Sequence, residues 1–296
     1  MASDTSLASS PLRAAADVVE SIGALDAPGR KIAETVRGAI GPGALRDAIS
    51  GTWIGHALHP LLTDVVIGSW TSATVLDLIG GPDSERAAQR LIGVGIAAYG
   101  PTALTGVSDW ADSELGNDGV RRVGLVHAAT NATALALYTA SLVHRRRGNR
   151  AKGVSLGLAG LGVASAGGYL GGHLAFRQGV GVDTTVFDAG AEDWTDALAA
   201  EDLHDGEPVA VQVGDAPVFV ARVGSTIHAL HDRCSHRGCS LASSGEVSGD
   251  VVTCTCHGSR FRLGDGALLR GPATAPQPPF DARERNGRIE LRRAVG

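Results

Sequence analysis

Two short boxes near the C-terminus contain all four cysteines of the chain. Cys234 and His236 form a Cys-x-His pair, and Cys254 and His257 form a Cys-x-x-His pair, with seventeen residues between His236 and Cys254. Thiolates and imidazoles in paired short boxes are the usual ligands of a protein-bound metal. We therefore expect a metal site to which each box contributes one Cys and one His.

The composition of the boxes bears on the metal. Two Cys and two His can hold a tetrahedral zinc ion. Zinc fingers, however, usually take both cysteines from one box and both histidines from the other, whereas each box here is mixed. A two-iron cluster in which one iron takes two thiolates and the other takes two imidazoles suits mixed boxes. A zinc site remains the alternative.

The boxes, Cys-Ser-His-Arg-Gly-Cys at 234–239 and Cys-Thr-Cys-His-Gly-Ser at 254–259, resemble those of Rieske iron-sulfur proteins. The resemblance implies a 2Fe-2S cluster with bridging sulfides between its irons. It also implies the ligands: Cys234 and Cys254 on one iron, His236 and His257 on the other.

Three further residues fit a subfamily, the Rieske proteins of quinol-oxidising cytochrome complexes, which carry a disulfide between the cluster loops. The resemblance implies a Cys239–Cys256 disulfide, with two buried free thiols as the alternative. Ser259 would donate to a cluster sulfur and raise the reduction potential. Phe261 stands where the high-potential members have a tyrosine, so we expect a lower potential than theirs.

Composition indicates two unlike halves. The chain has 296 residues, a formal charge of -5, 41 glycines and only 19% charged residues. The length allows two domains, and the charge gives no reason to expect a nucleic-acid partner. The mean hydropathy is near zero, as expected if a membrane half and a soluble half are averaged. The first 60 residues contain no apolar run typical of a cleavable signal peptide.

The N-terminal half is expected to be helical. Residues 1–52 form a tail with short amphipathic helices, and residues 53–178 contain four apolar segments, at 61–80, 91–108, 123–143 and 153–176. The first carries Asp64 and Asp77 and is a marginal span; the other three lack Asp, Glu, Lys and Arg. Their length favours a four-span transmembrane bundle over a buried soluble one.

Motifs in this half carry a second resemblance. Gly55-His-Ala-Leu-His-Pro-Leu-Leu-Thr-Asp64, Asp109-Trp110, His127 with Asn131, and Gly171-Gly-His-Leu-Ala-Phe176 resemble a bacterial four-helix membrane family of unknown function. The resemblance covers about residues 52–183. It implies a multi-pass protein of the bacterial cell membrane, in contact with lipid. The family name itself gives no indication of an activity.

Arginines indicate the orientation. With four spans, the loops at 81–90 and 144–152 share one side and carry seven Lys and Arg residues near the span ends, against four on the other side. The positive-inside rule places the richer side in the cytoplasm. The C-terminal domain is then extracytoplasmic, where a disulfide persists.

Four polar residues are expected at one level of the bundle: His59, Asp109, His127 and His173. Ionisable residues at or inside membrane helices are candidates for function. They could ligate a b-type haem or a metal, or line a quinone pocket, with His56 as a substitute for His59. Alternatively, each His only bonds a neighbour at the interface.

After a linker at 179–193, residues 194–296 are expected to form an antiparallel all-β sandwich. Valines alternate at 209–213, and Gly-containing turns separate them from 218–223 and 226–230. The proline-rich stretch 271–279 is expected to be a loop that covers the cluster. His236 and His257 are expected at the surface, where their outer nitrogens titrate.

No catalytic residue is predicted, because cluster chemistry is electron transfer. The primary hypothesis is a membrane-anchored carrier of single electrons, taking them from a quinol or a membrane haem. The alternatives are a ferredoxin-like donor to an oxygenase and a redox sensor or assembly protein. The expected partners are lipid and either quinone or a redox protein.

Overall fold

The computed structural model describes residues 10–294. The chain divides into two compact units. The helical unit contains the described residues up to Ala39 together with His59–Val180, and the β-unit contains Ile40–Leu58 together with the chain from Gly181 onward. The chain therefore passes between the units three times.

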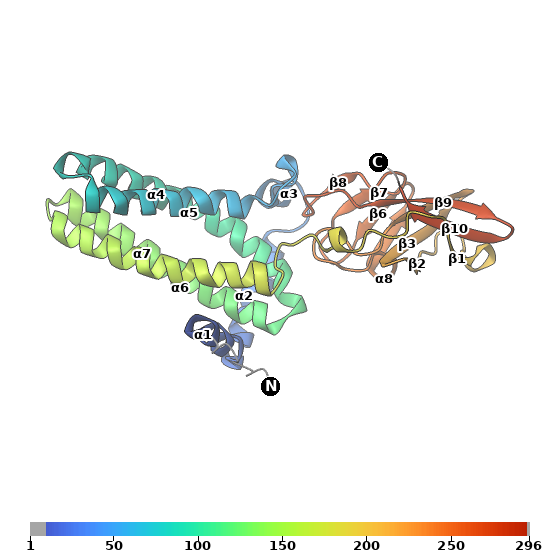
Figure 1. Cartoon of the computed structure of the whole chain (residues 1–296), viewed down its shortest axis with the longest axis horizontal. Helices are drawn as coiled ribbons and strands as arrows, with labels where there is room; N and C mark the ends of the chain where they lie inside the picture. Colours follow the sequence, from blue (N-terminus) through green and yellow to red (C-terminus); the bar gives the residue numbers. More distant parts are fainter. Residues whose placement is uncertain (1–9, 295–296) are drawn as a thin grey trace, which may run out of the picture. The chain divides into compact units, whose positions relative to one another are not determined.

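Six helices build the helical unit (Figure 1): α1 (Pro11–Glu20), α2 (Asp26–Ala39), α4 (Leu58–Ile79), α5 (Glu85–Ser113), α6 (Asp118–Arg146) and α7 (Arg150–Gly172). A π-helical turn, His173–Arg177, continues α7. The interior is aromatic as well as aliphatic: Trp70 of α4 stacks on Tyr138 of α6, with ring centroids 4.2 Å apart. The predicted helical character of this half is confirmed.

Three helices are long and apolar enough to cross a membrane: Leu58–Ile79, Glu85–Gly116 and Arg150–Arg177. The segment that looked marginal, in α4, is among them, whereas α6 is not. The middle of α6 contains His127, Asn131 and several threonines, which lower its hydropathy although it is free of Asp, Glu, Lys and Arg from 123 to 143. The count of four spans thus stays a prediction.

A buried ion pair explains one acidic residue in α4. Arg145 of α6, 2% exposed, donates Nη1–H to Asp77 Oδ1 at 2.7 Å and pairs with the second carboxylate oxygen as well. Arg145 also donates Nε–H to Ser141 Oγ. A carboxylate and a guanidinium tolerate burial only when paired in this way, so Asp77 does not count against a buried helix.

The N-terminal helices up to Ala39 pack on the helical unit. Arg122 of α6 holds Asp26 of α2 through two hydrogen bonds of 2.8 and 2.6 Å. Arg37 of α2 donates to the fully buried Glu114 at 2.8 Å. Residues 10–39 thus form helices on the surface of this unit. The Arg122 hydrogen bond is the main cause that holds the pKa of Asp26 below its usual value.

Residues 40–58 differ from the expected tail, because they belong to the β-unit. This segment forms α3 (Ala44–Ser50) and a single 3-10 turn, Thr52–Ile54. Gly51 connects them with φ of 85°, a left-handed conformation that favours glycine. The residues of the β-unit that this segment contacts lie more than 200 positions later in the chain. Local sequence patterns therefore did not reveal the contacts.

Two antiparallel sheets form the rest of the β-unit. The larger sheet has the order β1-β10-β9-β4-β3-β2 and the smaller has the order β5-β6-β7-β8. Their strands are β1 (Thr195–Ala199), β2 (Val209–Val213), β3 (Ala216–Val223), β4 (Thr226–His231), β5 (Gly245–Ser248), β6 (Val251–Cys254), β7 (Arg260–Arg262), β8 (Leu268–Arg270), β9 (Pro279–Arg285) and β10 (Arg288–Arg293). The strands and turns predicted at 209–230 are confirmed.

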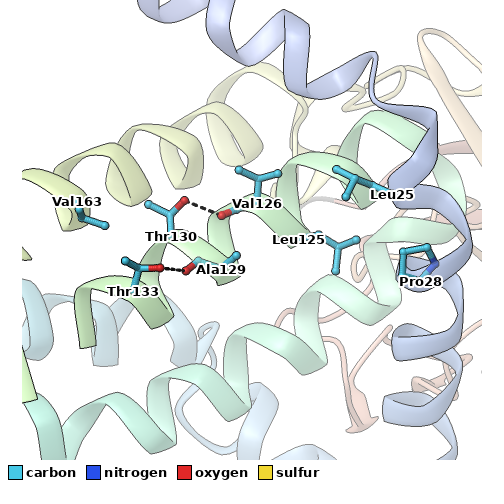
Figure 2. A pocket seen from close by; sticks show the side chains of 8 residues that line it. All are labelled: Leu25, Pro28, Leu125, Val126, Ala129, Thr130, Thr133 and Val163. Atoms are coloured by element: carbon cyan, nitrogen blue, oxygen red, sulfur yellow. Dashed lines mark hydrogen bonds between the residues drawn. The ribbon is translucent and has the colours of Figure 1, made fainter. Parts of the chain in front are cut away.

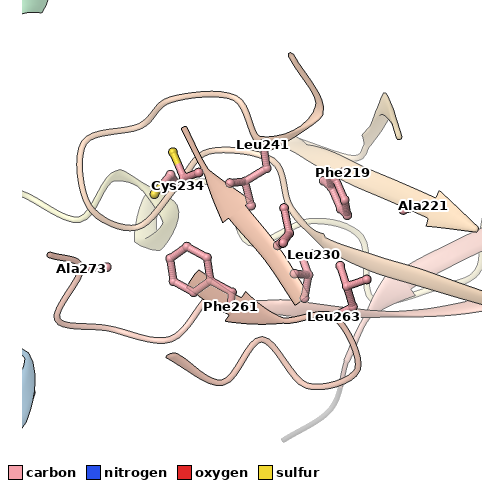
Figure 3. Packing of buried hydrophobic residues seen from close by; sticks show 10 residues of the cluster. Phe219, Ala221, Leu230, Cys234, Leu241, Phe261, Leu263 and Ala273 are labelled. Atoms are coloured by element: carbon pink, nitrogen blue, oxygen red, sulfur yellow. The ribbon is translucent and has the colours of Figure 1, made fainter. Parts of the chain in front are cut away.

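A buried cluster of hydrophobic side chains connects the sheets to the cysteines (Figure 3). Phe219 and Leu230 of the larger sheet and Phe261 of the smaller one are fully buried in it. Cys234 and Cys254 belong to the same cluster. Cys254 is the last residue of β6, and Cys234 lies three residues after the end of β4.

Candidate metal centre

Two loops of equal design carry the predicted ligands. The first follows β4 and contains Cys234; the second follows β6 and begins at Cys254. In each, the glycine four residues after the cysteine donates its N–H back to the cysteine carbonyl at 2.8 Å, from Gly238 and from Gly258. Both glycines have positive φ, 74° and 89°, a conformation that other residues adopt at a cost.

The thiols of Cys234 and Cys254 are the two free cysteine side chains of the chain, and both are buried. They share a hydrogen bond, which is the largest cause of the raised pKa of Cys234 and of the lowered pKa of Cys254, about 7. Backbone N–H groups of the following residues also face each sulfur and favour the thiolate. The lowered pKa of Cys254 favours its thiolate, the form in which a cysteine binds metal.

The two histidines lie together beside the thiols. Their ring centroids are 4.9 Å apart and the rings meet edge to face. Burial, followed by nearby positive charge, lowers the pKa of His236 well below its usual value, so the ring is neutral, as a metal ligand requires.

The prediction that these histidines are at the surface is wrong. His236 and His257 are only 8% and 9% exposed. The segment Ile40–Leu58 packs beside the second histidine: Pro42 lies against Gly258, where an added Cβ would be 3.1 Å from the proline ring. Arg46 is near enough to His236 to act on it electrostatically.

A disulfide joins the two loops, as the resemblance implied. Cys239 and Cys256 are bonded, with their Cα atoms 6.8 Å apart. The sulfurs of Cys239, Cys254 and Cys256 lie within 4.8 Å of one another, but bonded sulfurs are not thiolates and do not take part in ligation. The donors that remain are two thiols and two imidazoles.

The loop between β8 and β9 packs against both ligand loops, as predicted for 271–279. Ala273 donates its N–H to Ser259 Oγ at 3.0 Å, and Ser235 Oγ donates to the Ala275 carbonyl at 3.0 Å. Because Ser259 accepts this bond and is 1% exposed, its own hydroxyl hydrogen is available to a neighbouring sulfur. Phe261, fully buried, supplies no such donor.

Sequence reasoning missed Gln277. Its side chain is fully buried and its Nε2 donates to the carbonyls of His231 and Arg233, each at 2.6 Å. Its Oε1 accepts the N–H of Ser235 at 3.0 Å. A single glutamine in a proline-rich loop gives no signal in one sequence, yet this amide holds the first ligand loop.

The predicted second site is not assembled as a cluster of ligands. His59 and His127 use Nδ1 to bond the carbonyls of Thr102 and Gly167, each at 2.9 Å, and His173 Nε2 lies 2.5 Å from Glu20 Oε1. Among residues 10–294, the cysteine sulfurs form the one group of three or more such donors close enough to hold a metal. Haem is therefore not supported, and the proposed grouping of Asp109 with the three histidines stays a prediction.

A groove of about 540 Å³ lies on the helical unit (Figure 2). It is lined by Leu25, Pro28, Leu125, Val126, Ala129, Thr130, Thr133 and Val163. The two threonine hydroxyls donate to carbonyls of their own helix, at 2.7 and 2.9 Å. The lining therefore presents apolar atoms and shows no arrangement for a polar ligand.

The donor set fits a mixed-ligand two-iron cluster. Two thiols in contact and two adjoining neutral imidazoles, on loops fixed by a disulfide, meet the ligand requirement of such a centre. The fold and the site define an iron-sulfur electron-transfer domain.

Comparison with protein families agrees. Residues 193–281 match the Rieske [2Fe-2S] domain, and residues 55–184 match a predicted membrane protein family, DUF2231. The chain belongs to the Rieske family through its C-terminal domain, which carries electrons, and both resemblances seen in the sequence are confirmed.

The two relatives and the solved structure described next each match about a third of the chain. Ferredoxin CarAc of Metapseudomonas resinovorans is 35% identical over 97 residues, 32% of this chain and 90% of the ferredoxin. Sulredoxin of Sulfurisphaera tokodaii is 32% identical over 106 residues, 33% of this chain and 96% of that protein. A solved complex of reduced oxygenase and oxidized ferredoxin in carbazole 1,9a-dioxygenase contains a chain that is 32% identical; the match covers 35% of this chain and 97% of that one, with a TM-score of 0.33.

Proposed function

We propose that this protein is a membrane-anchored carrier of single electrons. Cys234 and Cys254 would bind one iron, and His236 and His257 the other. The observation that carries the proposal is the pairing of two buried thiols with two adjoining imidazoles at the ends of disulfide-linked loops. A bound 2Fe-2S cluster supplies one-electron redox chemistry; the chain supplies orientation, burial and hydrogen bonds.

The helical unit would be the anchor. Its three apolar helices and its match to a predicted membrane family support this part of the proposal. We retain the multi-pass arrangement in the bacterial membrane, with the Rieske domain on the extracytoplasmic side, as the expected topology. The arginine distribution supports that side, and a disulfide is compatible with it.

A redox protein is the partner that the relatives favour. Besides CarAc, the relatives include the anthranilate 1,2-dioxygenase ferredoxin subunit of Burkholderia cepacia, 31% identical over 99 residues. Such proteins are named as components of oxygenase systems, so an exchange of electrons with a protein follows by analogy. The domain boundaries proposed from sequence place the ferredoxin-like part at 194–296.

A quinol donor is a second candidate, favoured by the Cys239–Cys256 disulfide and by Ser259, which resemble the Rieske proteins of quinol-oxidising complexes. The midpoint potential of the cluster distinguishes a quinol donor from a redox-protein partner. A value in the range of quinols would favour the quinol donor, and a value well below zero would favour a ferredoxin-like exchange.

An EPR spectrum of the reduced, purified full chain tests the cluster. We expect the signal of mixed Cys and His ligation together with equal amounts of iron and acid-labile sulfide. Cys254→Ser and His257→Gln should lose the signal, whereas the double variant Cys239→Ser, Cys256→Ser, which removes cysteines beside the ligands, should keep it. A zinc content equal to the protein content would overturn the assignment.

A further inference from the structure

The segment Ile40–Leu58 is part of the β-unit although it lies between two helices of the helical unit in sequence. Two contacts fix it there. Thr52 Oγ1 donates to the Ala273 carbonyl at 3.0 Å, across 221 positions of sequence. Pro42 packs on Gly258 in the second ligand loop. The charge of Arg46, in the same segment, also contributes to the lowered pKa of His236. The segment thus touches the second ligand loop and the loop that covers the site.

The segment also places a positive charge, that of Arg46, in a buried environment. Arg46 is 4% exposed and donates Nη1–H to the Ile40 carbonyl of its own segment at 3.3 Å. A guanidinium is charged at every ordinary pH. Because water is largely excluded around Arg46 and His236, the field of this cation is screened less than that of a surface arginine.

We propose that Ile40–Leu58 is a cap on the histidine side of the cluster site. Arg46 of this cap is a positioning residue whose charge raises the reduction potential of the cluster. Reduction adds one negative charge near His236. A buried cation at that place stabilises the reduced form more than the oxidised form, so the equilibrium shifts toward reduction. The cap also keeps water from the two imidazoles.

This inference rests on the proposed cluster, and redox titration of the full chain tests it. Arg46→Gln should lower the equilibrium constant for reduction about tenfold, which for one electron is about 59 mV. Arg46→Lys should stay close to the wild type because it keeps the charge. Arg285→Gln, which removes an exposed arginine from β9, is the matched control and should shift the potential little.

A pair of glycine variants tests the cap without removing a charge. Gly51 and Gly55 both have positive φ, 85° and 70°, so alanine costs about 1 kcal/mol of backbone strain at either. A Cβ at Gly51 would also collide with the His56 carbonyl and lie 2.9 Å from Leu58 N, whereas at Gly55 the nearest atom is 3.9 Å away. Gly51→Ala should therefore displace the cap, and Gly55→Ala should not.

The readout for this pair is deuterium exchange near the reduced cluster, followed by pulsed EPR. We expect faster entry of deuterium and a lower potential in Gly51→Ala than in Gly55→Ala. If Arg46→Gln does not retain its cluster, the comparison of Gly51→Ala with Gly55→Ala still tests whether Ile40–Leu58 caps the site. An unchanged potential in Arg46→Gln, an equal shift in Arg285→Gln, or equal exchange in the two alanine variants would overturn the cap, while a missing EPR signal in the wild type would overturn the cluster itself.

Discussion

The side-chain carbonyl of Gln277 accepts the backbone N–H of Ser235, the residue between the first two predicted ligands, at 3.0 Å. The same amide donates to the carbonyls on either side of Asp232. One buried side chain thus satisfies three backbone groups of the first ligand loop, which has few regular partners of its own.

Gln277→Ala should destabilise this loop. The variant leaves one buried N–H and two buried carbonyls without a partner, and we expect it to lower the free energy of unfolding by roughly 2 to 4 kcal/mol. Denaturant unfolding of the β-unit, followed by cluster absorbance, measures this. Gln212→Ala removes an exposed glutamine that bonds Gly214 and should change stability by less than about 0.5 kcal/mol; equal effects of the two variants would contradict the proposed role.

The Cys239–Cys256 disulfide should stabilise the ligand loops without being a ligand. It closes a loop across 17 positions of sequence, for which loop-closure entropy predicts about 3 kcal/mol. The double variant Cys239→Ser, Cys256→Ser should therefore bind the cluster but lose it at lower denaturant concentration. Complete loss of iron in the double variant under native conditions would indicate that these sulfurs also bind metal.

Phe261→Tyr should raise the midpoint potential. The side chain is fully buried within the cluster of hydrophobic residues that includes Cys234, and high-potential Rieske proteins have a tyrosine hydroxyl at the matching place. A new donor to a ligand sulfur stabilises the reduced form, and we expect an effect of several-fold on the reduction equilibrium. Ser259→Ala should act in the opposite direction, and redox titration of both variants measures the two effects.

Asp77→Asn should destabilise the helical unit. Arg145 is 2% exposed, and removing its partner leaves a buried, uncompensated charge at a cost of about 3 to 5 kcal/mol. Thermal unfolding in detergent should show the loss. The double variant Asp77→Leu, Arg145→Met should recover most of it, whereas Arg146→Gln, at an exposed neighbour, should have little effect.

Stability of the β-unit should depend on the protonation of His231. This side chain is 1% exposed, and burial is the main cause of its lowered pKa. The unfolded chain, with a pKa of about 6.5, takes up a proton first, so stability is complete above that value and falls as the pH drops toward the folded pKa.

Unfolding between about pH 5.5 and 7.5 tests this dependence. His231→Gln, which does not ionise, should flatten the profile relative to the wild type, while the exposed His204→Gln should leave it unchanged. The difference between wild type and variant isolates His231 from other groups. A parallel profile in His231→Gln would contradict the prediction.

The residues proposed to form the metal centre could be recognised in the sequence because their signal is local. Each box places a Cys and a His within three positions, and the shared turn design ends in Gly238 and Gly258, which the boxes contain. The Cys239–Cys256 pairing followed from a resemblance to known proteins. Strand alternation at 209–213 and 218–223 has period two and needs no distant partner.

The surroundings of the centre were not predictable in this way. Pro42, which packs against Gly258, and Arg46, whose charge acts on His236, lie about 200 residues away in sequence, and no periodicity links them to the ligand loops. Gln277 had no motif. The apolar helices were recognised by length and composition, but Asp77 looked like an obstacle because its partner Arg145 lies in another helix.

The hydrogen bond from Thr52 to Ala273 has a consequence for how the protein can be divided. A chain shortened to begin at Gly181 would keep all four proposed ligands and the disulfide, yet it would lack the cap Ile40–Leu58. A chain ending at Val180 would keep residues 40–58 with no surface to rest on. The two halves of the chain are consequently not interchangeable modules joined by one linker, since the half that builds the helical unit also contains a piece of the β-unit.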